Sequence, residues 1–308
     1  MPREWYRKDI KMMSYPLITA IITTYNRTDL LQQAIESVLT QDYPNLELVV
    51  VDDCSTDTRT IDLCTRYEMK EPQKVRYIRL LKNSGGPVAR NTGIEAARGK
   101  YIAFLDDDDM WVSTKLSKQY ELISKSPSSV KLVYCWVDII AGDQKIGELN
   151  PTLRGNILRE AIPTQPISSL SSWLIDKEAF EKVRFDETLP RGQDGDFLRC
   201  YSRYYDVDYV PEQLLIYRTQ HGYSRITSTS IKGHKNAIVS ALRKLEKFKT
   251  ELEHLPKEKA EIYRYISNEY IEIGDQTNSI KYAFMAIICN PVNYDSVKRL
   301  IKSLLKRR

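Results

Sequence analysis

Apolar and polar positions form two alternating patterns along the first third of the chain. Short, nearly continuous apolar runs predict buried strands at 17–23 and 46–51, and two further strands are predicted at 74–80 and 101–105. Between them, apolar residues recur at three- and four-residue spacing, which predicts helices at about 30–39, at 60–69 and after Gly85-Gly86-Pro87. This alternation predicts an α/β fold with a mostly parallel central sheet and flanking helices.

The pattern changes in the remainder of the chain. Strands are predicted at 131–139, 171–175 and 213–217, with an acidic loop at 191–196. From residue 234 onward the chain is predicted to be helical, at 237–252, 257–273, 277–289 and 294–308. We therefore predict an α/β domain over 1–230 and a basic helical appendix over 231–308, loosely similar to one tetratricopeptide-type repeat.

Composition and targeting signals narrow the class of protein. The chain has 308 residues, with 42% hydrophobic and 28% charged, which excludes wholesale disorder. No apolar run approaches the ~20 residues that span a bilayer, and the basic N-terminus lacks the apolar core of a secretory signal. The five scattered cysteines contain no C-x-x-C pair, which disfavours a disulfide framework and a cysteine-rich zinc site. We expect a soluble cytoplasmic protein.

The positive charge is concentrated at the C-terminal end. Residues 231–308 carry 16 Lys and Arg against 9 Asp and Glu, whereas the rest of the chain carries 30 against 32. Because a nucleic-acid enzyme more often surrounds its cleft with basic residues, we expect no nucleic-acid partner. The amphipathic segment 294–308 is predicted either to lie on an anionic membrane surface at the inner face or to pack on neighbouring helices, and the appendix is a candidate homodimer surface.

Four consecutive carboxylates follow the fourth predicted strand. An isolated acidic run is usually a solvated loop, but this run, Asp106 to Asp109, comes directly after a buried strand and before Trp111. Adjacent carboxylates repel each other unless a cation compensates them, and hard oxygen ligands suit Mg²⁺ or Mn²⁺. Ligands of parallel sheets bind at the carboxyl ends of the strands, so we expect the polar clusters at 24–27, 52–53 and 106–109 to converge on one site.

Four sequence blocks in this order resemble family-2 nucleotide-sugar glycosyltransferases of the GT-A fold. They are TTYNR at 23–27, VVDDCSTD at 50–57, KNSGGPVARNTGIEAARGKYIAFLDDDDMW at 82–111 and GQDGDFLRC at 192–200. The resemblance covers roughly residues 16 to 224. It implies a GT-A α/β domain, to which the helical C-terminal extension is added.

The resemblance also implies roles for individual residues in binding the donor. The family's DxD signature falls on Asp106 and Asp108 as metal ligands, with Asp107 nearer the ribose and Asp109 expected to cap the next segment. Asp53 matches the acceptor of a hydrogen bond from the nucleotide base. The residues expected to contact the nucleotide or its diphosphate are Thr23, Tyr25, Arg27 and Arg90.

Two further positions complete the expected site. Asp194 matches the catalytic base of the family's E-D motif, although Gln193 replaces the Glu, and Asp196 is its rival two residues on. His221 resembles a late histidine that completes the metal or diphosphate contacts in relatives, with a surface histidine as the alternative.

The function implied by the resemblance is an inverting, metal-dependent glycosyltransferase. It would use Mn²⁺ or Mg²⁺ to move a sugar from a nucleotide-diphosphate sugar, with UDP favoured and GDP or dTDP as alternatives, to a glycan, polysaccharide or lipid-linked acceptor of the cell envelope. A nucleotidyltransferase acting on sugar phosphates is one alternative, but TTYNRTD lacks its Gly-rich phosphate loop. A nucleotide-sugar-binding protein without turnover is the other.

Overall fold

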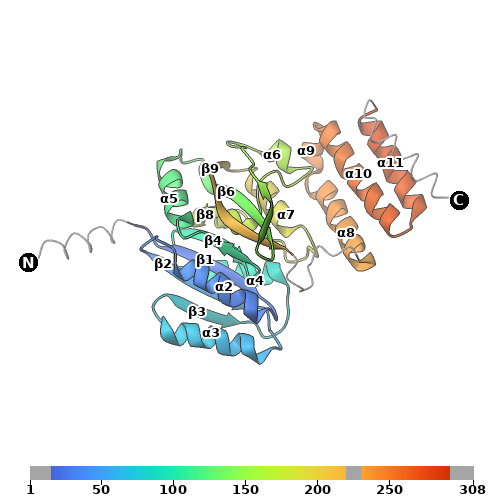
Figure 1. The fold of residues 1–308 in the computed structure, drawn as a ribbon. Helices are drawn as coiled ribbons and strands as arrows, with labels where there is room; N and C mark the ends of the chain where they lie inside the picture. Colours follow the sequence, from blue (N-terminus) through green and yellow to red (C-terminus); the bar gives the residue numbers. More distant parts are fainter. Residues whose placement is uncertain (1–14, 220–229, 292–308) are drawn as a thin grey trace, which may run out of the picture. The chain divides into compact units, whose positions relative to one another are not determined.

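The computed structural model describes residues 15–219 and 230–291, which form two compact units (Figure 1). The sheet unit contains the described residues 15–157, 166–187 and 200–219. The helical unit contains 158–165, 188–199 and 230–291. The sequence places one boundary near residue 230, whereas two short earlier segments also belong to the helical unit.

The sheet unit is built on one nine-stranded sheet of order β3-β2-β1-β4-β8-β6-β9-β5, with β7 paired to β6. The strands are β1 (Ile18–Thr24), β2 (Leu46–Asp52), β3 (Val75–Arg79), β4 (Tyr101–Asp106), β5 (Asp109–Trp111), β6 (Val130–Ala141), β7 (Gln144–Leu149), β8 (Leu174–Asp176) and β9 (Asp206–Thr219). Strands β3, β2, β1 and β4 are mutually parallel, as the alternating pattern predicts. The other half is mixed, because β8 runs antiparallel to both β4 and β6 while β9 runs parallel to β6.

Helices α2 and α4 cover opposite faces of the parallel strands (Figure 1). Alternate residues of a strand point to opposite faces, and Ile18, Ala20 and Ile22 belong to the core that packs against α2. On the other face Ile21 meets Gly93 of α4, where a Cβ would lie only 2.6 Å from the Ile21 Cγ2. Gly93 therefore allows α4 to approach the sheet closely.

The helices of the sheet unit differ from the predicted ones mainly after residue 110. They are α2 (Thr28–Leu39), α3 (Thr58–Lys70), α4 (Gly86–Ala96) and α5 (Lys115–Lys125), with short 3₁₀ turns at Leu170–Ser172 and Lys177–Glu181. The sequence pattern did not reveal β5, α5 or β7. The strand predicted at 171–175 is a 3₁₀ turn followed by the short β8.

The helical unit contains α6 (Leu158–Ala161), α7 (Gln193–Tyr201, of which 193–199 belong to this unit), α8 (Ile231–Lys247), α9 (Lys249–Glu253), α10 (Pro256–Glu272) and α11 (Gln276–Cys289). The helix predicted at 237–252 is two helices, because the chain leaves helical geometry at the buried Phe248. Helices α10 and α11 pack on each other as a hairpin whose stacked Tyr270 and Tyr282 rings are 5.6 Å apart. The acidic loop predicted at 191–196 is wrong, since α7 begins at Gln193.

A lysine is enclosed in the sheet unit. Lys115, the first residue of α5, is fully buried, and its Nζ lies 4.1 Å from the centre of the Trp111 ring. Within the described part of the chain this Nζ has no hydrogen-bond partner. Burial lowers the pKa of the Lys115 ammonium to about 8, because the interior disfavours its charged form.

We expect Lys115→Met to stabilise the protein at neutral pH. A folded-state pKa of about 8, against an ordinary 10.5, means that the charged form of Lys115 costs about 3 kcal/mol in the folded protein. The substitution also removes the contact with Trp111, so the gain in the free energy of unfolding should be smaller than this cost. The unfolded chain binds the proton more tightly, so this cost is complete below pH 8 and shrinks as the pH rises toward 10.5. Urea unfolding of both proteins at pH 7 and pH 9.5 measures the difference.

The matched control is Lys125→Met, because Lys125 lies on the same helix with its side chain exposed. It should change the free energy of unfolding little at either pH. An equal or lower stability of Lys115→Met at pH 7 would show that the buried ammonium contributes net stability.

Candidate functional site

Three parallel strands end side by side at one edge of the sheet. Thr24 is paired with Asp52 in the β1–β2 register, and Thr23 with Asp106 in the β1–β4 register. The polar segments that follow these strands are therefore neighbours, as the sequence predicts. Carboxyl ends of parallel strands are where α/β sheets bind their ligands.

Hydrogen bonds tie the loops after β1 and β2 together. Asn26 Oδ1 accepts from the backbone N–H groups of Thr56 (2.8 Å) and Asp57 (3.0 Å), and the Asn26 N–H donates to Ser55 Oγ at 2.9 Å. Asn26 and Cys54 both have left-handed backbone angles, with φ of 55° and 64°. Such conformations cost about 1–3 kcal/mol each and persist where the surrounding structure holds them.

The two acidic residues at the end of β2 have different surroundings. Asp52 is fully buried and accepts hydrogen bonds from the Ser55 N–H (2.8 Å) and the Tyr77 hydroxyl (2.9 Å), which makes it structural. Asp53 accepts from the backbone N–H groups of Ser84 (2.6 Å) and Gly85 (2.8 Å). Burial raises the pKa of Asp53, and these two amides partly oppose that effect.

Three of the four carboxylates at 106–109 lie close together, and the fourth, Asp107, is bound by neighbouring side chains. Asp107 is directed into the protein, where it accepts hydrogen bonds from Thr24 Oγ1 (2.7 Å) and Arg27 (2.9 Å). The other three, Asp106, Asp108 and Asp109, each offer an oxygen atom within 4.8 Å of the other two. Asp109, predicted as a cap for the segment leading to Trp111, is instead the first residue of β5, and its carboxylate belongs to this group.

Burial raises the pKa of two of these carboxylates. The pKa of Asp107 rises to about 7, although the nearby Arg27 guanidinium lowers it. The pKa of Asp109 lies well above its usual range, because of burial first and then the charges of Asp108 and Asp106. Asp109 Oδ2 is buried and has no hydrogen-bond partner among the described residues.

Three arginines surround the acidic run. Arg27 Nη1 lies 2.9 Å from Asp107 and 3.0 Å from Asp108, and Arg90 Nη2 lies 2.9 Å from Asp106. Arg218, near the end of β9, donates from Nε to the Asp108 carbonyl oxygen at 2.7 Å. Sequence reasoning missed Arg218, because nothing in the pattern predicts that β9 pairs with β5.

The remaining donor-binding candidates differ in exposure. Thr23 is half-buried within β1, whereas the Tyr25 side chain is exposed, so its ring is accessible for stacking. His221 lies outside the described residues.

The candidate base lies in the first turn of α7, in the helical unit. Asp194 is half-buried, whereas Asp196 is buried and pairs with Lys247 Nζ at 2.7 Å. An ion pair therefore holds Asp196 within the helical unit.

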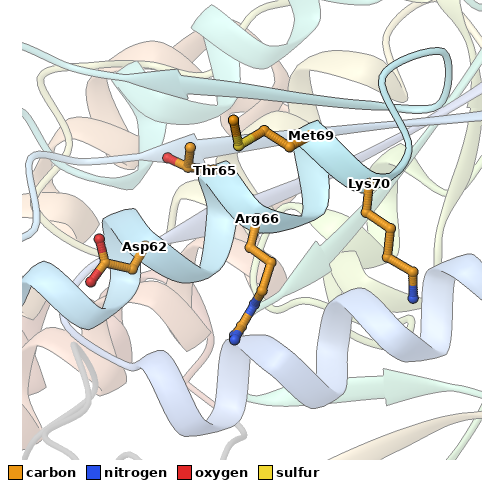
Figure 2. A pocket seen from close by; sticks show the side chains of 5 residues that line it. All are labelled: Asp62, Thr65, Arg66, Met69 and Lys70. Carbon is orange, nitrogen blue, oxygen red and sulfur yellow. The ribbon is translucent and has the colours of Figure 1, made fainter.

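A hollow of about 570 Å³ on α3 lacks the features of a site (Figure 2). Its lining residues lie on one face of this single helix, and they are Asp62, Thr65, Arg66, Met69 and Lys70. No second element contributes a group that could converge on a ligand.

The donor atoms of the carboxylate group suit a hard divalent cation. Mg²⁺ and Mn²⁺ prefer carboxylate oxygens, and Asp109 contributes a buried oxygen that lacks another partner among the described residues. Mutual repulsion within the group would also be relieved by a cation. The residues present therefore fit a divalent metal.

A group of carboxylates at the strand ends of an α/β sheet is typical of a ligand-binding α/β domain. Comparison with known proteins identifies the family. Residues 19–184 match glycosyl transferase family 2, so the chain belongs to this family and is a glycosyltransferase. This membership decides against the nucleotidyltransferase alternative.

Two curated relatives illustrate the similarity. The putative teichuronic acid biosynthesis glycosyltransferase TuaG of Bacillus subtilis is 44% identical over 108 residues, which are 35% of this chain and 42% of that relative. The putative colanic acid biosynthesis glycosyl transferase WcaA of Escherichia coli K12 is 30% identical over 233 residues, which are 71% of this chain and 78% of that protein.

Solved structures share the GT-A fold. Residues 1–349 of S. aureus TarS superpose with a TM-score of 0.65 at 17% identity, covering 93% of this chain and 88% of that one. The mannosyltransferase PcManGT of Pyrobaculum calidifontis, solved with GDP-Man and Mn²⁺, gives 0.54 at 18% identity, covering 100% and 88%. Over 15–219 and 230–291, none of the helices has the length and apolar character needed to cross a membrane.

We expect Asp109→Asn to separate charge repulsion from metal binding. In EDTA, at a pH high enough to ionise Asp109, the variant should melt at a higher temperature than the wild type, because it removes one buried like charge. With Mn²⁺ the wild type should gain thermal stability through ligand linkage, and the variant should gain less. Differential scanning fluorimetry with and without Mn²⁺ measures both effects.

Asp107→Asn is the comparison variant, because Asp107 is not one of the three grouped carboxylates and accepts hydrogen bonds from Thr24 and Arg27. It should keep the Mn²⁺-dependent shift. A full Mn²⁺ shift in Asp109→Asn would remove Asp109 from the ligand set.

Proposed function

We propose that this glycosyltransferase moves a sugar from a nucleotide-diphosphate sugar to a hydroxyl group of an envelope polysaccharide or its lipid-linked precursor, with inversion at the anomeric carbon. The observation that carries the proposal is the group of three carboxylates between the end of β4 and the start of β5, beside the end of β1. It lies at the sheet edge where this fold class binds ligands.

Asp106, Asp108 and Asp109 would hold Mn²⁺ or Mg²⁺, and His221 is kept as a further ligand from the sequence. When bound, the cation neutralises charge that develops on the diphosphate leaving group. The ion pairs of Arg90 with Asp106 and of Arg27 with Asp108 hold these carboxylates in place. A diphosphate would compete with the carboxylates for the same two guanidinium groups, which gives Arg27 and Arg90 their donor contacts.

Asp53 would accept a hydrogen bond from the nucleotide base. Two backbone amides already orient its carboxylate, and each carboxylate oxygen has a second lone pair. Tyr25 would stack on the base through its exposed ring, with Thr23 and Asp107 near the nucleotide and its ribose. The imide N–H of uracil or thymine and the N–H donors of guanine all suit a carboxylate, so Asp53 does not choose the base. A UDP-sugar stays the favoured donor from the sequence resemblance, with GDP- and dTDP-sugars as alternatives.

Asp194 would act as the general base that removes the proton from the acceptor hydroxyl. Attack from the face opposite the leaving group inverts the anomeric centre, which requires one carboxylate on the acceptor side. Asp194 is half-buried at the start of α7, and the competing Asp196 is held by Lys247.

The relatives suggest the biological process. TuaG and WcaA are named for the biosynthesis of teichuronic and colanic acid, and TarS has been solved with UDP-GlcNAc. We therefore propose a role in envelope polysaccharide synthesis, in the cytoplasm. Contact with the inner membrane face through 294–308 and homodimer formation stay predictions from the sequence, and that segment lies outside the described residues.

The proposed roles predict a separation of binding from turnover. Asp108→Asn should weaken Mn²⁺-dependent binding of the cognate nucleotide sugar at least tenfold, because it removes one of the three carboxylates that would hold the metal. Asp194→Asn should bind the donor within twofold of wild type yet lose about 10²–10⁴-fold in turnover. Calorimetry with UDP-, GDP- and dTDP-sugars and a donor-hydrolysis assay measure the two quantities.

The control is Asp62→Asn, an exposed acid on the outer face of α3 (Figure 2), which should change neither quantity. If the wild type bound no nucleotide sugar under any metal condition, the proposal would be wrong. Normal turnover in Asp194→Asn would reassign the base.

A further inference from the structure

A small cavity in the helical unit is lined by more positive than negative charge. Its volume is about 180 Å³, and its walls come from residues 164–165, the start of α7, helix α8 and Tyr265 of α10. Pockets for whole small-molecule ligands usually measure ~300–1,000 Å³, so this cavity suits one chemical group and not an entire sugar nucleotide.

Three cations and one carboxylate line the cavity: Arg191, Arg199, Lys244 and Asp196. The carboxylate is already paired, since Asp196 Oδ2 lies 2.7 Å from Lys247 Nζ. Arg199 is buried, and its guanidinium lies over the Phe248 ring and donates to the Ala161 carbonyl oxygen. The cavity therefore has an excess of positive charge.

The charge on Lys244 is unfavourable in this environment. Burial first, and then the adjacent Arg199, lower the pKa of its ammonium to about 7, while Asp196 partly opposes both effects. Within the described residues Lys244 Nζ makes one hydrogen bond, to the Pro163 carbonyl oxygen at 3.2 Å. An ammonium has three N–H donors, so most of its capacity is unused there.

Two more features favour a small ligand with acceptor atoms. Ser240 Oγ, one turn before Lys244 on α8, is buried without a hydrogen-bond partner among the described residues. Gly195 leaves room beside Arg199, because a Cβ at that position would lie 3.1 Å from Arg199 Nη1. Gly192 and Gly195 also bring the start of α7 to the cavity wall, and a helix N-terminus favours negative charge.

We propose that this cavity binds a compact oxyanion, a phosphate or a carboxylate, carried by the acceptor substrate. The assignment to the acceptor rests on the proposed function and on closeness in sequence. Gly192, Gly195 and Asp196 line the cavity, and the proposed base, Asp194, lies between them. An anionic group held at this turn of α7 would bring its own sugar hydroxyl toward Asp194. The enzyme would then select acidic acceptors over neutral ones.

The first experiment titrates inorganic phosphate into the full-length protein at constant ionic strength, with chloride as the balancing anion. We expect phosphate to raise the melting temperature of the wild type and Lys244→Met to weaken phosphate binding at least tenfold. Lys235→Met, an exposed lysine on the same helix, should bind phosphate as the wild type does. Ser240→Ala keeps all three cations of the cavity and should weaken phosphate binding by a smaller factor. It is the test variant if Lys244→Met does not fold.

Equal effects of phosphate and chloride, or unchanged phosphate binding in both Lys244→Met and Ser240→Ala, would overturn the proposal. Nucleotide-sugar binding is measured on the same variants and should not change. A failure of donor binding in the wild type would contradict the proposed function, whereas the phosphate titration tests the cavity independently.

The second experiment identifies the source of the oxyanion with matched acceptors. A hexuronate-containing oligosaccharide and its carboxyl-reduced neutral form are compared in the transfer assay. We expect Lys244→Met to raise KM at least tenfold for the acidic acceptor while leaving KM for the neutral form unchanged. Loss of phosphate binding with no change in either KM would overturn the assignment to the acceptor, because the cavity would then bind free phosphate.

Discussion

Repulsion among four consecutive carboxylates is the constraint that organises the sheet unit's site. At the end of a buried strand, Asp106 to Asp109 cannot all be solvated, so each must find a partner or remain unfavourable. Asp107 turns inward to Thr24 and Arg27, which leaves the other three oxygens near one another. Arg27, Arg90 and Arg218 reach the run from three other elements, so the site depends on the assembled sheet.

The helical unit contains the opposite electrostatic situation. Arg199 and Lys244 are buried close enough for one to lower the pKa of the other, and the nearest carboxylate is committed to Lys247. In both units an unfavourable concentration of like charge persists around a small number of atoms. Such concentrations are common at functional sites, because a ligand of opposite charge relieves the repulsion when it binds. The acidic group suits a cation, and the basic cavity suits an anion.

The strength of the local pattern decided which parts of the fold were predictable. The parallel strands β1, β2 and β4 are buried on both faces, so their apolar runs are nearly continuous and the helices between them are clearly periodic. Strands β5 and β8 have three residues each and form through pairing with distant strands, which leaves no local signal. Segment 191–196 looks like a loop because Gly192, Gly195 and two acids dominate it, yet packing in the helical unit supports α7 there.

The sequence by itself determined the family, the parallel half of the sheet and the adjacency of three polar strand ends. These follow from local periodicity and from the order of residues along the chain. In a parallel sheet, residues that follow successive strands lie at the same edge, so their order in the sequence gives their place in the fold. Only the tertiary structure decided that Asp109 joins Asp106 and Asp108, that Arg218 meets the acidic run and that Asp196 pairs with Lys247. The reason is that burial, charge pairing and pKa depend on which distant segments pack together, and long-range packing leaves no trace in local spacing.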